Sequence, residues 1–308
     1  MILYMPCYHP IRMYRSRAGR NKETGKWPLV TSISQGYADM PVDVPCGRCI
    51  GCRLEYSRQW AVRAIHEAKL HDANSFITLT YAPEYLPADV SIHVDEMQRF
   101  LKRLRKAVDP VKIRFICAGE YGSRYKRPHY HLLIFGYDFP DKYVYKLVHG
   151  YKYYRSPLLE KVWPYGISCI GDVTFESAAY VARYILKKIK GEDEELKESI
   201  YQGRSPEFMT MSRKPGIAAD WIAKHINDVY SVDSVIVRND IRCKPPRFYD
   251  HYLEFVDPER FQRVRYAREK LAKEHDLDCE RLLREEYVKS KKLEKLIRRY
   301  HADLDSIE

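Results

Sequence analysis

The hydrophobic and polar residues between positions 75 and 190 follow the period of strands and then of helices. Stretches rich in β-branched and aromatic residues predict strands at SFITLTY (75–81), VKIRFICAGE (111–120), HYHLLIFGY (129–137) and GISCIGDV (166–173). Apolar residues at helical spacing predict helices at VDEMQRFLKRLRKAV (94–108) and SAAYVARYILKKI (177–189). This order of elements indicates an α+β fold, a central antiparallel sheet with helices packed on one face.

The segments on either side have weaker patterns. Residues 1–57 carry scattered Pro, Gly and Arg and are expected to be irregular, followed by a helix from about Glu55 to His71. After Gly191 the patterns weaken until Asp257, where an Asp-Pro pair predicts a helix start. We therefore expect three parts: a cysteine-containing segment (1–57), a main domain (58–256) and a charged helical tail (257–308).

The tail is expected to hold a second helix around Arg281 to Tyr300. Its apolar residues are spaced so that they can pack on the first tail helix or on the main domain; they are Leu282, Val288, Leu293, Leu296 and Ile297.

Charge changes the picture, because the chain carries a formal net charge of +11 with a pI near 9.1. Residues 99–155 hold 14 Lys/Arg against 4 Asp/Glu, whereas the tail holds 14 against 13. The basic excess therefore lies around the third predicted strand and favours a polyanionic partner. A solvated basic face kept for solubility is the alternative.

Other features of composition exclude several protein classes. Hydrophobic residues make up 45% of the chain, which allows a sizeable core and excludes global disorder. The N-terminus MILYMPCYHP is too short and too interrupted for a secretory signal or a membrane span. Eight cysteines, three of them crowded together, do not fit a secreted disulfide framework. We expect a protein of the reducing cytoplasm. The 26 tyrosines suit stacking on unpaired bases, but they are also ordinary half-buried residues.

Two histidines stand one residue apart at the start of the third predicted strand. Side chains alternate along a strand, so His129 and His131 point to one face and Tyr130 to the other. Glu120 closes the preceding strand and is joined to His129 by a short basic loop, as in a hairpin. Two imidazoles and one carboxylate suit Mg²⁺ or Mn²⁺ with open coordination positions. Paired structural histidines are the alternative.

The last predicted helix of the main domain carries two tyrosines one turn apart. At 100° per residue, Tyr180, Arg183, Tyr184, Lys187 and Lys188 fall on the polar side. Neighbouring positive charge favours the phenolate form, which a nucleophile requires. Two amphipathic surface tyrosines would give the same pattern.

The third candidate site is the cysteine cluster CGRCIGC. Cys46, Cys49 and Cys52 are spaced to wrap one ion, and Cys7 can complete a four-cysteine zinc site. A ferredoxin pattern would need a fourth cysteine further along the chain, where Tyr56 stands. Reduced thiols without metal are the alternative.

These motifs together resemble the HUH family of rolling-circle endonucleases, and within it the replication initiators of gokushovirus-type microviruses, which are single-stranded DNA phages. The resemblance covers the chain to about residue 255. It is carried by FITLTY, RPHYHLLIFG and YVARYILKK, in this order, and by the segments CGRCIGCR, PEFMTMSRKPG and CKPPRFYD.

The resemblance implies an HUH core, which is a ferredoxin-like or RRM-like α+β fold. It implies that His129, His131 and Glu120 hold the catalytic Mg²⁺ or Mn²⁺ and that Tyr180 and Tyr184 are paired nucleophiles. Lys187, Lys188 and Arg183 would lower a tyrosine pKa or hold the phosphate. The product is a free 3′-OH and a 5′-phosphotyrosyl bond, and a second cut later releases and closes the displaced strand.

The expected partner is single-stranded origin DNA of a phage replicative form, in the cytoplasm of a bacterial host. Basic residues can guide this unpaired strand; they are Arg103, Arg105, Arg124, Lys126, Arg127 and Arg183. The nearest approach to a phosphate loop, GRNKETGKW, has one residue too many and Trp27 in place of Ser or Thr. Unwinding is therefore expected to come from supercoiling or a host helicase, with a host polymerase for synthesis.

Three other functions remain open. An HUH transposase or relaxase would use the same chemistry. A non-catalytic, zinc-stabilised nucleic-acid-binding protein would form no covalent adduct. A metal-dependent nuclease that activates water would not need Tyr180 or Tyr184.

Overall fold

A computed structural model describes residues 7–23, 25–122, 125–148, 150–187, 199, 201–238, 241–273 and 278–305. Side chains are described for these residues except 184–187, 238, 272–273 and 295–305. The elements of this part of the chain are β1 (Ile11–Ser16), β2 (Leu29–Val30), β3 (Gly36–Val44), α1 (Ile50–Ala68), β4 (Asn74–Thr80), η1 (Pro83–Tyr85), α2 (Val94–Ala107), β5 (Arg114–Tyr121), β6 (Pro128–Phe135), β7 (Tyr143–Val148), β8 (Tyr151–Arg155), α3 (Pro157–Val162), β9 (Ser168–Gly171), α4 (Phe175–Lys187), β10 (Phe208–Met211), α6 (Ala219–Ser231), β11 (Val235–Arg238), β12 (Ile241–Cys243), α7 (Arg247–Val256), α8 (Pro258–Lys273) and α9 (Cys279–Asp305).

The described residues form two compact units. One contains residues 56–273 and 297–305, and the other contains residues 7–55 and 278–296. Each unit is described by itself below.

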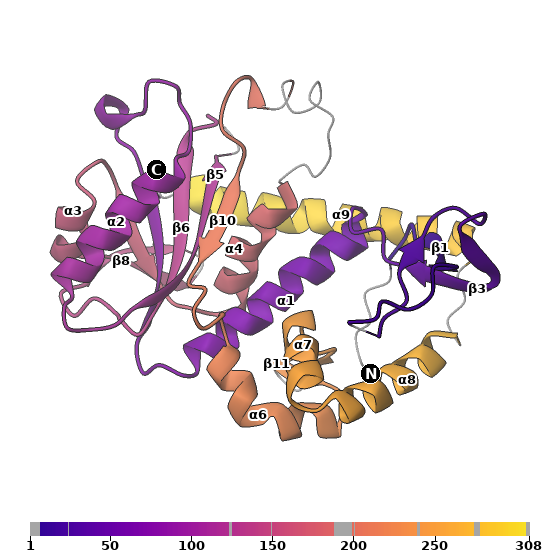
Figure 1. The fold of residues 1–308 in the computed structure, drawn as a ribbon. Coiled ribbons are helices and arrows are strands. Elements are labelled where there is room, and N and C mark those ends of the chain that lie inside the picture. Colours follow the sequence, from indigo (N-terminus) through magenta and orange to yellow (C-terminus); the bar gives the residue numbers. More distant parts are fainter. Residues whose placement is uncertain are drawn as a thin grey trace. The chain divides into compact units, whose positions relative to one another are not determined.

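The first unit is built on a seven-stranded sheet in the order β10-β5-β6-β4-β9-β8-β7, in which every pairing is antiparallel. The predicted α+β fold is confirmed. All four predicted strands are present, as β4, β5, β6 and β9 (Figure 1). β5 and β6 pair from Arg114↔Phe135 to Tyr121↔Pro128, which is the predicted hairpin.

Helices cover both faces of this sheet, and the expectation of one covered face is wrong. On one face, Ile77, Leu132 and Ile134 pack with residues of α2 and α3. On the other, Phe76 and Leu133 pack with residues of α1 and α4 (Figure 1). The central strands are apolar on both sides, so two layers of helices are needed to bury them.

The predicted helix 94–108 is α2, and its amphipathic pattern determines how it packs. Met97, Phe100, Leu101 and Leu104 are all buried. Acidic residues occupy its first turn and basic residues its last turn, which complements the helix dipole. The helix predicted for residues 55–71 is α1, which begins at Ile50 and so includes Cys52.

The remaining helices of the first unit follow the sheet in sequence. The predicted Asp257 cap is present, since Oδ1 of Asp257 accepts a hydrogen bond of 2.9 Å from the Arg260 backbone at the start of α8. Further along α8, Arg268 donates hydrogen bonds to Asp233 and Asp250. These contacts tie α8 to the loop after α6 and to α7.

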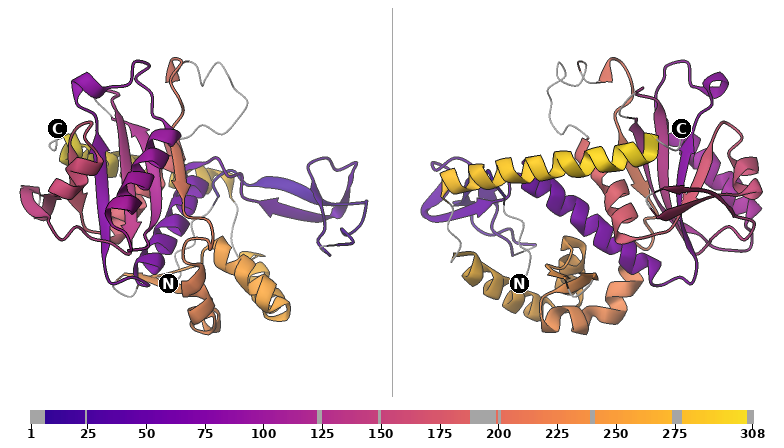
Figure 2. Two further views of the ribbon diagram at one scale, coloured as in Figure 1. Left: turned by 60° about the vertical axis from the view of Figure 1, so that its left-hand side comes forward. Right: turned by 180° about the vertical axis from the view of Figure 1, so that it is seen from behind.

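In the second unit, residues 7–55 are not irregular as expected. They contain a three-stranded antiparallel sheet in the order β2-β1-β3, and the left view of Figure 2 shows its strands in violet. Pro41 lies within β3. Proline is tolerated there because β3 is an edge strand.

The tail helix α9 is present as predicted for residues 281–300. Leu282 is buried against Tyr8 and Cys49 in the second unit. Val288, expected to pack, is 50% exposed. Leu296 and Ile297 lie outside the described side chains. No helix among the described residues has both the length and the hydropathy needed to cross a membrane.

Candidate active site

His129 and His131 lie on β6 and face the layer formed by α1 and α4. Tyr130 faces the opposite layer, as strand alternation predicts. In the register of the sheet, His129 pairs with Glu120 and Thr80, and His131 pairs with Ala118 and Thr78. The two histidines and the glutamate therefore come together from two adjacent strands.

A buried hydrogen-bonded group forms around the Glu120 carboxylate. Its Oε1 shares a hydrogen bond of 2.7 Å with Nε2 of His131 and accepts one of 3.2 Å from the Tyr180 hydroxyl. The rings of His131 and Tyr180 meet edge to face with centroids 5.1 Å apart. Metal-ligand candidates and the tyrosine thus converge on one carboxylate oxygen.

Thr78 fixes the orientation of the His131 ring, and the sequence analysis did not find it. Its hydroxyl shares a hydrogen bond of 3.1 Å with Nδ1 of His131, which leaves Nε2 facing Glu120. Phe76 stacks on the same ring at 5.9 Å. A threonine in the middle of an apolar strand was the available indication, but its partner follows only from the register of β4 with β6.

Gly122 is a second residue that the sequence analysis missed. It follows β5 in the β5–β6 turn, and its backbone N–H donates to the Arg127 carbonyl at 2.9 Å. A Cβ atom at this position would lie 2.9 Å from Cε1 of His129. Only glycine leaves the imidazole its present position.

Tyr180 lies on α4 and is 6% exposed, so its expected place on a polar helix face is corrected. It packs with Val181 and the sheet because α4 lies directly over β5, β6 and β10. The Arg183 guanidinium lies 5.8 Å from the centroid of the Tyr180 ring. The side chains of Tyr184 and Lys187, and all of Lys188, lie outside the described part of the chain.

The donor set fits a divalent metal ion. Glu120, His129 and His131 are 3%, 9% and 1% exposed, and they lie in an otherwise apolar layer. Burying such groups costs free energy unless they are paired with each other or with a cation. Two imidazole nitrogens and a carboxylate are ligands of Mn²⁺, Mg²⁺ and related ions, and the Thr78 contact is typical of the support that such histidines receive.

The predicted DNA-binding residues are spread over several places. Lys126 and Arg127 are in the β5–β6 turn next to His129, where Arg127 donates a hydrogen bond of 2.6 Å to the Tyr81 carbonyl. Arg103 and Arg105 are on α2, which covers the opposite face of the sheet from the histidines. Arg124 lies outside the described residues.

Arg103 also has a structural contact, because its Nε donates to the Val162 carbonyl at 3.0 Å. Neither arginine of α2 is therefore brought to the histidine site, and their contact with DNA stays a prediction.

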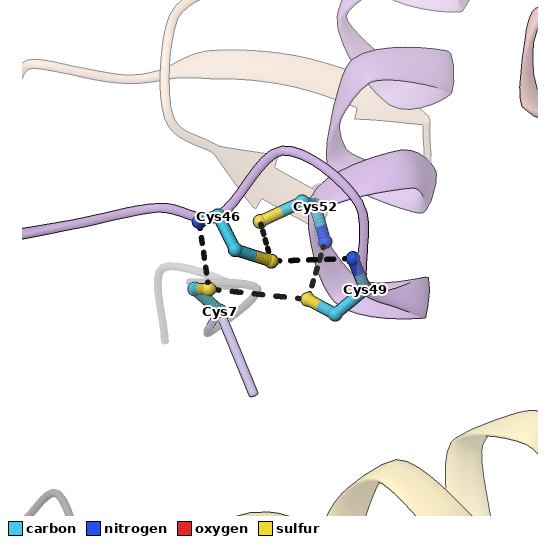
Figure 3. Close-up of side chains that lie close together, drawn as sticks. All are labelled: Cys7, Cys46, Cys49 and Cys52. Atoms are coloured by element: carbon cyan, nitrogen blue, oxygen red, sulfur yellow. Dashed lines mark hydrogen bonds between the residues drawn. The ribbon is translucent and has the colours of Figure 1, made fainter. Parts of the chain in front are cut away.

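The four candidate zinc ligands do come together, in the second unit (Figure 3). The Sγ atoms of Cys7, Cys46, Cys49 and Cys52 all lie within 4.8 Å of one another. Burial raises the pKa of the Cys46 thiol, but backbone N–H groups of Cys49 and Arg48 outweigh it and lower the pKa to about 7.

The chain is similar to known proteins over most of its length. A family model of replication-associated proteins of the ORF2 type matches residues 74–189, which include β4, β5, β6 and α4. Replication-associated protein VP4 of Bdellovibrio phage phiMH2K is 34% identical over 268 residues, covering 83% of this chain and 80% of that protein. Replication-associated protein ORF2 of Spiroplasma virus 4 is 31% identical over 294 residues, covering 87% of each.

Replication-associated protein ORF4 of Chlamydia phage 1 is 31% identical over 219 residues, covering 68% of this chain and 53% of that protein. No solved structure matches the chain. Identity at this level across more than four fifths of the chain and about four fifths or more of two relatives indicates common descent. The chain belongs to the replication-associated protein family of microvirus-type phages.

Proposed function

We propose that this protein starts rolling-circle DNA replication by nicking single-stranded origin DNA through tyrosine transesterification. One observation carries the proposal: His131 and the Tyr180 hydroxyl both bind Oε1 of Glu120 within a buried layer. A metal-ligand set and a nucleophile must lie this close together if both act on one phosphodiester.

The attacking group is the Tyr180 oxygen. It forms a bond to the phosphorus while the bond from phosphorus to the 3′ oxygen breaks. The 3′ oxygen takes up a proton and leaves as a 3′-OH, and the 5′ phosphate remains joined to the tyrosine. Glu120 accepts the hydrogen bond of this phenol, and we assign it as the group that receives the phenolic proton.

The other residues bind and orient. His129, His131 and Glu120 would hold the Mn²⁺ or Mg²⁺ ion, which when bound polarises the phosphate oxygens. Thr78 keeps the His131 ring in one orientation. The positive charge of Arg183 near the Tyr180 ring favours phenolate and attracts phosphate.

Tyr184 follows Tyr180 by one helical turn on α4, and we assign it the second cut. The phosphotyrosyl bond retains the free energy of the broken linkage, so closing the displaced strand needs no nucleoside triphosphate. This agrees with the departure of GRNKETGKW from a phosphate loop. The printed names of the relatives, all replication-associated proteins of small phages, support the role in replication.

The test is a covalent-adduct assay. Single-stranded oligonucleotides that tile a microvirus origin region carry a 3′ label, because the proposed linkage holds the 3′ fragment. They are mixed with the protein and Mn²⁺ and run on a denaturing gel. We expect a labelled band at the mobility of the protein that EDTA prevents. Glu120→Gln should lower its rate of formation by about 10²-fold or more, and Tyr180→Phe/Tyr184→Phe should abolish it.

Tyr130→Phe is the matched control. It also removes a buried hydroxyl from this sheet, but on the face away from the histidines, and it should keep the adduct. Cleavage without an adduct would indicate activated water instead of tyrosine. An adduct that persists in the double tyrosine variant would disprove the assignment.

A further inference from the structure

We propose that Cys7, Cys46, Cys49 and Cys52 bind one zinc ion in a closed, structural site. Two pairs of sulfurs, Cys7–Cys49 and Cys46–Cys52, are 3.9 and 4.0 Å apart. Tetrahedral zinc with Zn–S bonds of about 2.3 Å holds its sulfurs about 3.8 Å from one another. The spacing of these thiols therefore matches one ion at their centre (Figure 3).

Backbone N–H groups point at the sulfurs. Cys7 Sγ accepts from the Cys46 backbone at 3.2 Å, and Cys46 Sγ accepts from the Cys49 backbone at 3.2 Å. Cys49 Sγ accepts from the Tyr8 backbone at 3.4 Å. Gly47, with φ of +72°, allows the tight turn that starts this loop. Four thiolates around Zn²⁺ carry two net negative charges, and such hydrogen bonds stabilise them.

The geometry also distinguishes zinc from other uses of four cysteines. In a four-iron cluster each cysteine binds a different iron atom, so the sulfurs lie further apart than around one ion. All four cysteines are free thiols and not disulfides. Zinc has no redox chemistry, and a site with four protein ligands has no open position for substrate. The ion therefore has a structural role.

That role is to organise the second unit. Tyr8 and Cys49 are buried against Leu282 of α9. One turn further along α9, Glu286 shares a hydrogen bond of 2.6 Å with His9 and accepts one of 3.4 Å from the Ile50 backbone. The residues next to the zinc ligands thus form the surface that receives the first turns of α9.

The test measures bound metal in the full-length protein purified under reducing conditions. Inductively coupled plasma and native mass spectrometry should find one zinc ion per chain, and Co²⁺ should give the visible bands of a tetrahedral thiolate site. Cys49→Ser should lose the zinc. Cys52→His, which keeps a zinc ligand, should retain most of it. Cys279→Ser, which changes an exposed thiol, should keep all of it.

A second variant separates this site from the histidine site. His129→Ala/His131→Ala should still contain one zinc ion. Chelation should increase hydrogen exchange in residues 279–294 of the wild-type protein. Wild-type protein that binds no zinc when supplied with it would overturn the proposal, and so would iron at one equivalent or zinc retained in Cys49→Ser.

A different observation leads to a second inference, which rests on the proposed function. We infer that the β7–β8 hairpin binds single-stranded DNA. Its tyrosines Tyr143, Tyr145 and Tyr151 are 50%, 43% and 63% exposed. Residues 142–155 contain four Lys/Arg and no Asp/Glu. Exposed aromatic rings among positive charges are the composition that stacks on bases and holds a phosphate backbone.

The hairpin is joined to the sheet face that carries the histidines. Thr78, which contacts His131, pairs with Cys169 on β9, and Tyr154 of β8 pairs with the neighbouring Ile170. Ile170 and Tyr154 face the opposite layer, so the residues beside Tyr154 face the histidine side.

Charges of the hairpin reach this face. Burial raises the pKa of the Cys169 thiol to about 11, and the positive charges of Arg155 and Lys146 oppose that increase. β8 is three strands from β6, or about 14 Å. A strand of DNA leaving the site in this direction meets the hairpin within a few nucleotides.

Fluorescence anisotropy with a labelled 30-nucleotide oligo(dT) tests this. Tyr143→Ala/Tyr145→Ala/Tyr151→Ala should raise Kd about tenfold or more, because each stacked base contributes roughly 1–3 kcal/mol. Phe255→Ala/Tyr266→Ala removes two rings that are 85% and 71% exposed, and it should leave Kd within twofold.

The triple variant should still form the covalent adduct at saturating oligonucleotide. Unchanged affinity in the triple variant would overturn the inference about the hairpin and leave the proposed chemistry intact. Failure of the wild-type protein to form any adduct would instead count against the proposed function.

Discussion

Four polar side chains form a hydrogen-bonded row inside an apolar layer: Thr78, His131, Glu120 and Tyr180. All are buried, with exposures of 7% or less. A buried polar group that loses its partner costs about 1–3 kcal/mol, so each member stabilises its neighbours. Removing the Tyr180 hydroxyl therefore affects both the proposed chemistry and the packing of α4, and variants of this row need a stability measurement beside the activity assay.

Gly122→Ala separates these effects, because it changes the position of His129 without removing a functional group. The new methyl would lie 2.9 Å from Cε1 and 3.3 Å from Nδ1 of the imidazole, which must turn away. We expect adduct formation to fall by about 10²-fold, the effect of moving a catalytic group by about 1 Å. Thermal unfolding should show a loss of no more than about 1–3 kcal/mol.

Gly171→Ala is the matched control. It adds a methyl to β9 on the same face of the sheet, 3.4 Å from the Phe76 ring, which is an ordinary contact. It should retain adduct formation within about twofold. If both glycine variants behaved alike, the close approach of Gly122 to His129 would have no role in the reaction.

The sequence predicted part of this site and not the rest. The spacing of His129 and His131 and the hairpin to Glu120 follow from strand alternation and a short loop, and the register confirms both. Thr78 is 53 residues from His131 in the chain, and its contact depends on how β4 pairs with β6. Gly122 matters through one interatomic distance. Such contacts arise from long-range pairing, which local patterns do not specify.

At the scale of elements, the predicted strands are those with buried, β-branched runs. β4 and β6 are almost entirely buried and read clearly in the sequence. β7 and β8 are rich in exposed tyrosine and lysine, and β10 is only four residues long. Their strand conformation comes from pairing at or near the sheet edges, and composition alone does not indicate it.

The helices illustrate the same limit. α2 shows a clear amphipathic pattern because one side is buried against the sheet and the other is exposed. α4 was misread at Tyr180 because a tyrosine ring counts as polar by its hydroxyl but packs as an apolar group against Phe76 and His131. The burial of tyrosine depends on whether its hydroxyl finds a partner, and here Glu120 provides one.

At the scale of the whole molecule, basic residues close in sequence do not form one surface. The 14 Lys/Arg of residues 99–155 are spread over α2, the β5–β6 turn and the β7–β8 hairpin. The α2 residues cover the sheet face away from the histidines, so charge density along the chain overstates the number of basic groups near the site. The turn and the hairpin keep the expectation of a polyanionic partner in force.

Stability of the molecule should decrease in mild acid because of one buried histidine. His66 on α1 stacks on Trp221 of α6 at 3.5 Å and shares a hydrogen bond of 2.7 Å with the Tyr249 hydroxyl of α7. Burial, with smaller contributions from Lys69 and His225, lowers its pKa to about 3. The unfolded chain binds a proton here near pH 6.5 and the folded chain does not.

The free energy of unfolding should therefore fall as the pH decreases from about 6.5 toward 3, by up to about 1.4 kcal/mol per pH unit from this group. Urea unfolding between pH 7.5 and 4.5 measures the slope. His66→Phe, which keeps a ring against Trp221 but does not titrate, should be less stable at pH 7 and show a shallower slope. His251→Gln, which changes a histidine with a 60% exposed side chain, should keep the wild-type slope. Parallel curves for wild type and His66→Phe would show that His66 is not the group whose protonation opposes folding, and that carboxylates account for any acid sensitivity in this range.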